Sequence, residues 1–180
     1  MINAIDFTST FKSPFGELIV VVDEAGTLTR LFLPNGHDQW ANGIVESGLH
    51  VVKDARRCAP VFAQLDEYFQ GKRKVFDLAL HAQGTAFQRS VWAALQAIPY
   101  GSTISYKELA QRIGQPEAVR AVGRANGSNP IPIVIPCHRV IGADGSLTGF
   151  GGGLLLKEQL LSLEGAIAPA LASAHQLALM

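Results

Sequence analysis

Apolar runs on either side of a turn signal predict a β-hairpin near the start of the chain. The β-branched run 18–22 and the apolar run 28–33 lie on either side of the turn Glu24-Ala25-Gly26. Two such runs around a short turn are typical of antiparallel strands, and we therefore expect a hairpin over 15–33. Residues 34–57 follow neither the strand period nor the helix period, so we expect a loop there with a short helix at most.

A helix and a further strand are expected to complete this first part of the chain. The helix is indicated by four apolar residues that recur with helical spacing, Val61, Leu65, Tyr68 and Phe69. It should end at Gly71-Lys72-Arg73-Lys74, after which Val75–Leu80 has the pattern of a strand. The expected fold is an N-terminal α/β domain with an antiparallel hairpin sheet.

The polar run Gln83-Gly84-Thr85 indicates a boundary between two domains. The N-terminal domain would span 1–83 and a C-terminal domain 84–168, with a tail over 169–180. The chain of 180 residues is long enough for two small domains. Its last residues, 166–180, are rich in Ala and Leu and are compatible with a loose helix.

Helix signals dominate the second domain. Two capping boxes open its first two helices, one formed by Thr85 and Gln88 and the other by Ser105 and Glu108. A third helix is expected over 117–126, and a last one after the run of three glycines. The side chains expected to face the core are Phe87, Val91, Leu95, Ile98, Leu109, Ile113, Ala118, Val122, Ala125, Leu156, Leu160 and Leu163.

The second and third of these helices have the form of a helix-turn-helix, joined by Gly114-Gln115-Pro116. We therefore expect a helical C-terminal domain with a winged-helix-like helix-turn-helix, so that the whole chain is an α+β/α two-domain protein. The same pattern also fits a helical hairpin that binds no DNA.

One face of the third helix carries Arg120 and Arg124, with the small residues Ala121, Gly123 and Ala125 around them. Small side chains let a helix approach a partner closely while arginines reach phosphates. Alternatively, the small residues pack against a neighbouring helix and the arginines are solvated. The sequence leaves both interpretations open.

Composition and charge narrow the classes of protein. The formal net charge is zero, which argues against gross electrostatic binding of nucleic acid, although residues 1–85 have a balance of −2 and residues 86–180 one of +2. No apolar run reaches the roughly 18 residues of a membrane helix, and the N-terminus has no apolar signal core. Cys58 and Cys137 fit neither a disulfide framework nor a zinc spacing. We expect a cytoplasmic protein with free thiols, no membrane contact and no metal.

The strongest chemical signal is Cys137 beside His138, at the end of an apolar run interrupted by Pro130, Pro132 and Pro136. The prolines argue against a helix and favour an extended or turning backbone, so the cysteine is expected on a rigid, non-helical segment. A thiol acts as a nucleophile once a neighbouring base or cation makes it a thiolate. Cys137 could therefore be inert and buried, the nucleophile of a hydrolase, or an acceptor that keeps the group it receives.

Adjacent side chains on an extended strand point to opposite faces, so direct contact between Cys137 and His138 is not expected. A bridging water would connect them more easily. Glu164, at the edge of the last leucine stripe, is the candidate partner of the imidazole, because an unpaired carboxylate at an apolar edge is costly. This gives a relay from Glu164 through His138 and water to Cys137. The alternative is that Glu164 turns to solvent at the end of its helix.

The cysteine segment and its surroundings resemble a known family. Pro136-Cys137-His138-Arg139-Val140 is the signature of that family. Further motifs stand at the family's spacing, namely Ile104-Ser105-Tyr106, Arg120-Ala121-Val122-Gly123, Asn126, Asn129-Pro130 and Gly152-Gly153. The chain is similar to the O6-alkylguanine-DNA alkyltransferases, also called methylated-DNA–protein-cysteine methyltransferases, in their short bacterial form. The match covers residues 85–165, and the first part is compatible with the family's ribonuclease H-like domain.

The resemblance implies roles for individual residues and no cofactor. Cys137 would accept the alkyl group after Glu164 and His138 draw off its proton through water. Tyr106 would donate a hydrogen bond or a proton to the departing guanine. Asn129 would brace the turn that leads to the cysteine segment.

The implied partner is double-stranded DNA with O6-alkylguanine, bound through its minor groove by a monomer. Arg120 would fill the gap left by a flipped nucleotide, and a phosphate contact of Arg124 is inferred from this sequence rather than from the family. The residues expected at the DNA are Arg120, Ala121, Gly123, Arg124 and Tyr106, and those expected in the substrate pocket are Asn126, Pro132, Val140, Phe150 and Gly151. Because Phe150 and Gly151 stand where relatives often have tyrosine and serine, the pocket is expected to differ in substrate range.

Such a transfer would be irreversible, because a thioether has no carbonyl for water to attack, so each molecule would act once. O4-alkylthymine is a further candidate substrate. Two other classes remain as alternatives. A DNA-binding sensor of alkylated bases would replace the cysteine that this chain has, and a cysteine hydrolase would need an oxyanion-hole signature that the sequence lacks.

Overall fold

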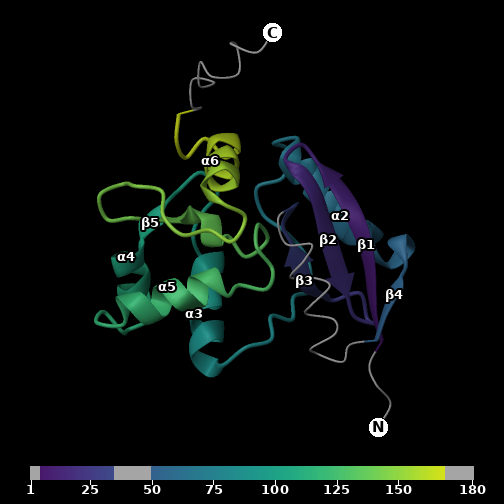
Figure 1. The fold of residues 1–180 in the computed structure, drawn as a ribbon, viewed down its shortest axis with the longest axis horizontal. Helices are drawn as coiled ribbons and strands as arrows, with labels where there is room; N and C mark the ends of the chain where they lie inside the picture. The colour runs from purple at the N-terminus through teal and green to yellow at the C-terminus, as the bar shows by residue number, and fades with distance from the viewer. Residues whose placement is uncertain (1–4, 35–49, 169–180) are drawn as a thin grey trace.

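The computed structural model describes residues 5–34 and 50–168 and shows two units side by side (Figure 1). One unit is a sheet with a helix on one face, and the other consists mainly of helices. The expected tail over 169–180, and most of the loop expected after the hairpin, lie outside the described residues. Within these two described ranges, no helix is both long and apolar enough to cross a membrane.

Four strands form the sheet of the first unit, in the order β3-β2-β1-β4: β1 (Ile5–Ser13), β2 (Gly16–Val22), β3 (Leu28–Phe32) and β4 (His50–Lys53). The hairpin predicted over 15–33 is confirmed as β2 and β3. The hydrophobic pattern missed β1, because its residues between Phe7 and Phe11 are polar. Its antiparallel register with β2 holds it in place, with Phe7 opposite Val22. β4 pairs with β1 in parallel and lies within the segment that was expected to be a loop.

Helix α2 (Ala55–Phe69) packs against β1 and β2 and buries Cys58, Val61, Leu65, Tyr68 and Phe69. It is capped by Asp54, whose carboxylate accepts a hydrogen bond of 2.9 Å from the backbone N–H of Arg56. The predicted helix is therefore confirmed, and it begins earlier than its apolar stripe, inside the expected loop.

The strand predicted over Val75–Leu80 is wrong. These residues run as extended chain from the first unit to the second and form a single β-bridge, between Leu80 and Leu28. The alternating side chains of Phe76, Leu78 and Leu80 pack against the core. Alternation alone does not distinguish a strand from a connecting segment in which every second side chain is covered.

In its described residues the second unit contains four α-helices and a short parallel strand pair: α3 (Ala86–Gln96), β5 (Ile104–Ser105), α4 (Tyr106–Arg112), α5 (Val119–Gly127), β6 (Val140–Ile141) and α6 (Leu154–Leu163). Both predicted capping boxes are present. Helix α5 begins slightly later than expected, because Pro116 and Glu117 form a turn.

One apolar core runs through both units. At their junction the backbone N–H of Leu31, in β3, donates a hydrogen bond of 2.9 Å to the carbonyl oxygen of Pro130. Within the second unit, the indole N–H of Trp92 donates to the carbonyl oxygen of Ala125 at 2.8 Å, which ties α3 to α5. Strand β3 is thereby held beside the segment that leads to Cys137.

Candidate active site

Cys137 lies in a single turn of 3-10 helix, η2 (Cys137–Arg139), so of the extended and turning backbones that the prolines favour, the turning one is present. The backbone N–H of Arg139 donates to the carbonyl oxygen of Pro136 at 3.1 Å. Proline lacks an N–H but keeps its carbonyl, so one tight turn can follow it. The strand argument for separating Cys137 from His138 is therefore wrong. Their side chains nevertheless make no direct hydrogen bond, since Nδ1 of His138 has no partner among the described residues.

The side chain of Asn129 holds the segment that precedes the cysteine. Its Nδ2 donates to the carbonyl oxygen of Ile135 at 2.7 Å, and its Oδ1 accepts from the backbone N–H of Ile131 at 3.0 Å. Between them Ile133 has a φ of 74°, a left-handed conformation that is costly for a branched residue. These hydrogen bonds help to offset that strain and fix the approach to Cys137.

Glu164, which directly follows α6, is buried and accepts hydrogen bonds from several directions. The donors to Oε1 are Nε2 of His138 (2.9 Å), the hydroxyl of Tyr68 (2.7 Å) and Nη2 of Arg139 (2.9 Å), and the donors to Oε2 are Nε of Arg139 (2.8 Å) and the N–H of Gly101 (3.3 Å). The alternative in which Glu164 turns to solvent is excluded. The predicted pairing of Glu164 with His138 is present. The contact with Arg139, which stands in the signature itself, was not predicted, and neither was that with Tyr68, for which no local signal exists.

The surroundings of His138 and Glu164 set the protonation state of each side chain. Burial would raise the pKa of Glu164, but the hydrogen bonds from His138 and Arg139 outweigh it and bring the pKa to about 2. Burial lowers the pKa of His138, against the opposing influence of Glu164. The carboxylate is therefore ionised and the imidazole neutral. Because a carboxylate only accepts hydrogen bonds, Nε2 of His138 carries the proton and Nδ1 has a free lone pair.

The thiol of Cys137 is protonated at rest. It is almost completely buried, with 4 % of its surface exposed. Burial raises its pKa to about 11, and the contact with Asn129 and the charge of Lys157 offset only part of that effect. A thiol of this kind needs a base before it can act as a nucleophile.

Lys157 is a further buried group that the sequence analysis missed. Its ammonium, on α6, donates to the carbonyl oxygens of Val140 at 2.5 Å and Thr148 at 2.7 Å. Its position in the leucine-rich helix gave no signal, since a lysine among leucines normally extends to solvent. The two hydrogen bonds join the strand behind Cys137 to the loop that leads to Phe150.

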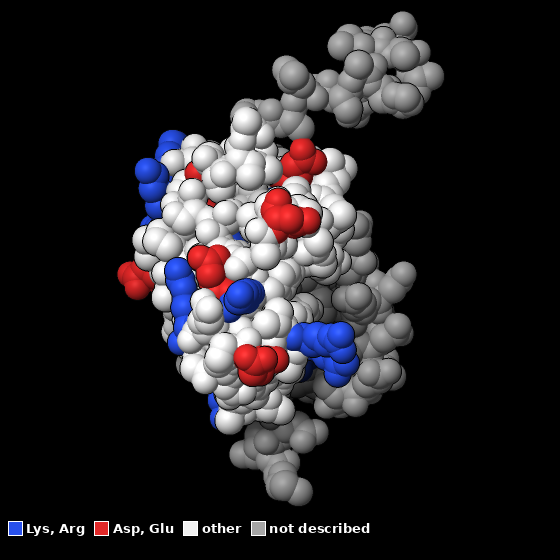
Figure 2. Space-filling view, turned by 90° about the vertical axis from the view of Figure 1, so that its left-hand side faces the viewer, with Lys and Arg blue, Asp and Glu red and all other residues white. Residues whose placement is uncertain are grey.

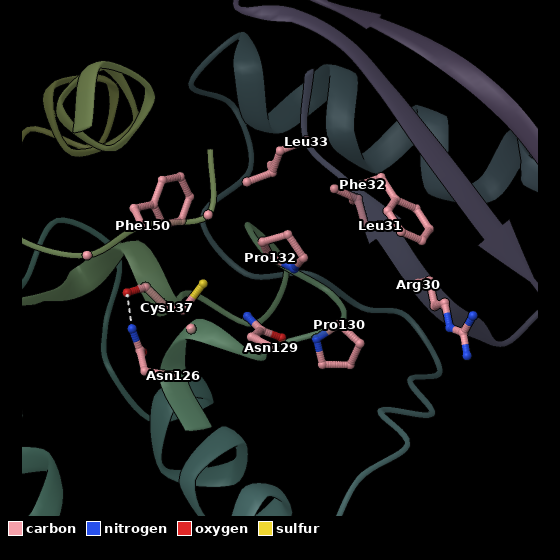
Figure 3. A pocket seen from close by; sticks show the side chains of 13 residues that line it. Arg30, Leu31, Phe32, Leu33, Asn126, Asn129, Pro130, Pro132, Cys137 and Phe150 are labelled. Atoms are coloured by element: carbon pink, nitrogen blue, oxygen red, sulfur yellow. Dashed lines mark hydrogen bonds between the residues drawn. The ribbon is translucent and has the colours of Figure 1, made fainter. Parts of the chain in front are cut away.

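A cavity of about 270 Å³ opens beside Cys137, and Figure 3 shows the sulfur pointing into it. Its lining comes from the cysteine region and from strand β3: Arg30, Leu31, Phe32, Leu33, Asn126, Gly127, Asn129, Pro130, Pro132, Cys137, Gly149, Phe150 and Gly151. Of the predicted pocket residues, Asn126, Pro132, Phe150 and Gly151 line the cavity, whereas Val140 is buried in β6 and does not. The contribution of β3 was not foreseen, because nothing in the hairpin sequence connects it with the cysteine.

Tyr106 begins helix α4 at the edge of this region and is half-buried. Its hydroxyl donates to the carbonyl oxygens of Thr148 at 3.3 Å and Gly149 at 3.4 Å. Its ring lies against Gly123, where an added Cβ would be 3.8 Å from Cδ1 of the ring. Gly123 therefore faces the ring of Tyr106, at a distance that leaves room for no more than van der Waals contact with a small side chain.

Helix α5 presents Arg120, Ala121 and Arg124 to solvent and buries Ala125. The small residues thus fit both interpretations of the sequence, since Ala125 packs inward while Ala121 leaves the outer surface flat. Figure 2 shows the side of the molecule on which α4 lies. Basic and acidic side chains are interspersed there among uncharged ones. Electrostatic attraction on this side would come from individually placed cations and not from a broad basic patch.

Two family profiles match the chain. The ribonuclease-like domain of 6-O-methylguanine DNA methyltransferase matches residues 7–82, and the DNA binding domain of the same enzyme matches residues 86–166. A methylated-DNA–protein-cysteine methyltransferase of Methanosarcina acetivorans is 46% identical over 164 residues, which are 88% of this chain and 98% of the relative. The constitutive enzyme of that name from Bacillus subtilis is 44% identical over 163 residues, 89% of this chain and 96% of the relative.

Solved structures give the same result. The crystal structure of Mycobacterium tuberculosis OGT in complex with DNA has a TM-score of 0.79 and 44% sequence identity to this chain, and the alignment covers 92% of this chain and 96% of that protein. The two-domain architecture, with an N-terminal α/β domain and a helical C-terminal domain, is thereby confirmed. By its sequence, its fold and the cysteine segment at its site, the chain belongs to the family of methylated-DNA–protein-cysteine methyltransferases, enzymes of DNA repair.

Proposed function

We propose that this chain repairs duplex DNA by moving the alkyl group of O6-alkylguanine onto Cys137, once per molecule. The observation that carries the proposal is the placement of Cys137 between a cavity and a buried base. Its sulfur points into the cavity, while the neutral imidazole of the adjacent His138 is backed by an ionised carboxylate. A thiol with a pKa of about 11 is ionised in only about one molecule in ten thousand at pH 7, so this base is what makes the reaction feasible.

The transfer proceeds as an in-line displacement. The Cys137 proton passes through a water molecule to Nδ1 of His138, and Glu164 stabilises the imidazolium that forms. The thiolate attacks the alkyl carbon, a carbon–sulfur bond forms, and the bond between that carbon and O6 breaks with its electron pair on the guanine. Tyr106 supplies a hydrogen bond or a proton to the departing base, which would otherwise leave as an anion. His138 then releases the proton that it took from Cys137 to solvent, and an equivalent proton neutralises the guanine or restores Tyr106. The products are S-alkylcysteine and neutral guanine.

The product explains why each molecule acts once. A thioether contains no carbonyl that water could attack, and an alkyl group does not leave sulfur readily. The alkyl group comes from the DNA and the acceptor is a side chain, so the reaction requires no cofactor. The same transfer, from a base oxygen to the cysteine sulfur, applies to O4-alkylthymine, which we include as a further substrate.

The depth of Cys137 implies that the damaged base leaves the helix stack to react. We place α4 and α5 at the minor groove as a helix-turn-helix, with Arg120 filling the gap that the base leaves and Arg124 at a phosphate. Ala121 allows close approach of α5, and Gly123 lets Tyr106 reach the base. The OGT protein of M. tuberculosis was crystallised in complex with DNA, which supports DNA as the partner of this chain. One monomer in the cytoplasm suffices for the whole reaction.

The flipped base would occupy the cavity lined by Asn126, Pro132, Phe150 and Gly151. The ring of Phe150 offers an aromatic face, and backbone groups near Val140 and Gly151 read the guanine edge. The carbonyl oxygen of Val140 accepts a hydrogen bond from Lys157, whereas Gly151 lies at the cavity itself. Without the hydroxyl and the larger side chain that relatives often have at 150 and 151, the site would accept bulkier groups.

Intact-protein mass spectrometry tests the proposal. The protein is incubated with a duplex that contains one O6-methylguanine, and we expect one added methyl group, located on Cys137, and unmodified guanine in the DNA. Cys137→Ala should remain unchanged in mass, and Cys58→Ala, which removes the other buried thiol, should react as the wild type does. An unmodified protein that turns over esters or amides would contradict the proposal.

A further inference from the structure

Tyr68 connects the first unit of the fold to the proposed proton relay. It lies on α2, and its hydroxyl donates a hydrogen bond of 2.7 Å to Oε1 of Glu164, a residue 96 positions away. Other donors to this carboxylate, His138, Arg139 and Gly101, belong to the second unit. The contact therefore brings a group from the ribonuclease-like domain into the chemistry of the DNA-binding domain.

The oxygen that Tyr68 contacts is the one that serves His138. Oε1 of Glu164 accepts from Nε2 of His138 at 2.9 Å and from Nη2 of Arg139 at 2.9 Å in addition to the tyrosine hydroxyl. Each donor stabilises the charged form of the carboxylate and draws electron density away from the hydrogen bond to the imidazole. Tyr68 thus lowers the proton affinity of both members of the pair.

The hydroxyl of Tyr68 has little freedom to point elsewhere. The side chain is fully buried, and its ring is enclosed by Phe69 at 5.3 Å, Phe76 at 5.3 Å and Tyr100 at 6.1 Å between centroids. Those three rings come from α2, from the connecting segment and from the loop after α3. A buried hydroxyl without a partner is costly, so packing and hydrogen bonding hold Tyr68 at the carboxylate together.

We propose that Tyr68 is a positioning residue through which the first domain tunes the His138–Glu164 pair and extends the working range of Cys137 toward lower pH. The inference rests on the proposed function, because it assumes that His138 receives the thiol proton. A protonated His138 or Glu164 cannot take up that proton. By favouring the ionised carboxylate and the neutral imidazole, Tyr68 delays both protonations as the pH falls.

Other charged and titratable groups lie around the His138–Glu164 pair. Arg139 and Tyr100 face Glu164, and Lys157 and Cys137 lie near His138. Burial raises the pKa of Tyr100. Removal of the Tyr68 hydroxyl therefore changes one donor and leaves these charges in place.

The test is the pH profile of Cys137 alkylation by free O6-benzylguanine, which requires no DNA contact. In Tyr68→Phe we expect the acidic limb of the profile to move to higher pH by about one unit, the size expected for loss of one hydrogen bond to a charged group. The fraction alkylated at completion counts the folded molecules, so partial unfolding would lower the amplitude at every pH without moving the limb. Tyr100→Phe is the matched control, because its hydroxyl donates to the backbone carbonyl of Leu163 at 3.1 Å.

Two further variants separate the possible outcomes. In a protein that already carries Glu164→Gln, adding Tyr68→Phe should not move the acidic limb further if Tyr68 acts through the carboxylate. Site-specific 3-fluorotyrosine at position 68 is a stronger donor of nearly unchanged shape, and it should move the limb to lower pH even if Tyr68→Phe folds poorly. If the wild type reacts normally but the acidic limb moves in neither position-68 variant, the inference is overturned and the proposed function stands. A wild type that does not react would instead overturn the proposed function.

Discussion

The ammonium group of Lys157 donates a 2.5 Å hydrogen bond to the carbonyl oxygen of Val140, the residue that follows the 3-10 turn of the cysteine. A second hydrogen bond, of 2.7 Å, goes to the carbonyl oxygen of Thr148. A buried cation on α6 therefore joins the strand behind Cys137 to the loop that ends at Phe150. The shape of the cavity depends on this connection, since Gly149 and Phe150 form one of its walls.

We expect Lys157→Met to slow alkyl transfer while leaving Cys137 in place. Methionine has a similar length but no donor, so the carbonyls of Val140 and Thr148 both lose their partner. A hydrogen bond from a charged group contributes about 1.5–3 kcal/mol, and a rate loss of roughly tenfold or more follows if that energy positions the reacting groups. The rate with free O6-benzylguanine measures the effect. Lys12→Met, on the exposed side of β1, is the control, and equal rates in all three proteins would contradict a positioning role.

The buried carboxylate of Glu164 should make stability depend on pH. Burial alone would raise its pKa, but the hydrogen bonds from His138 and Arg139 bring it from 4.5 to about 2. Since the folded pKa is the lower one, the stabilisation is complete above about pH 4.5 and is lost as the pH falls through 2. Between pH 6 and pH 3 this loss is on the order of 2 kcal/mol. Urea unfolding at both pH values should show that the free energy of unfolding falls further in the wild type than in Glu164→Gln, and parallel decreases would contradict the assignment.

Short-range signals predicted much of this fold. The capping boxes at Thr85 and Ser105 involve residues three positions apart, and both are present. Helices marked by apolar stripes were likewise confirmed, because a helix buries one face whatever lies opposite. The prediction of a strand over 75–80 was wrong, because strand pairing requires a neighbouring strand that the local pattern does not specify.

Only the site residues that belong to the second domain could be predicted from the sequence. The contact between His138 and Glu164 was predicted, because the second domain offers one acidic residue near the core and a histidine beside the cysteine. It is confirmed by the hydrogen bond of 2.9 Å between Nε2 of His138 and Oε1 of Glu164. Tyr68 and Leu33 could not be found in this way, because they come from another unit and have the sequence pattern of ordinary core residues. At Cys137 the prolines left an extended and a turning backbone open, because proline excludes a regular helix but not a single turn stabilised by its own carbonyl.

Arg120 should matter for duplex DNA and not for the free base. It is exposed on α5, away from the cavity lining, so Arg120→Ala would remove the proposed DNA contact without altering the site of transfer. We expect repair of a duplex with O6-methylguanine to slow by tenfold or more, while the rate with free O6-benzylguanine stays within twofold of the wild type. Arg56→Ala, equally exposed on α2, should change neither rate. If both rates of Arg120→Ala fall together, the residue supports the fold and not the DNA contact.

Leu33 should influence which alkyl groups the site accepts, because the first unit supplies one wall of the cavity. Its side chain is nearly buried and lies so close to Gly152 that an added Cβ there would be 2.8 Å from Cδ1 of Leu33. Leu33→Ala enlarges the cavity, so the ratio of the benzyl rate to the methyl rate on duplex substrates should rise severalfold, at a cost in stability of about 2–5 kcal/mol. Leu18→Ala removes a buried leucine from β2, outside the cavity lining, and should lower stability without changing the ratio. A ratio that changes equally in both variants would show that general loosening, and not the wall formed by Leu33, determines substrate range.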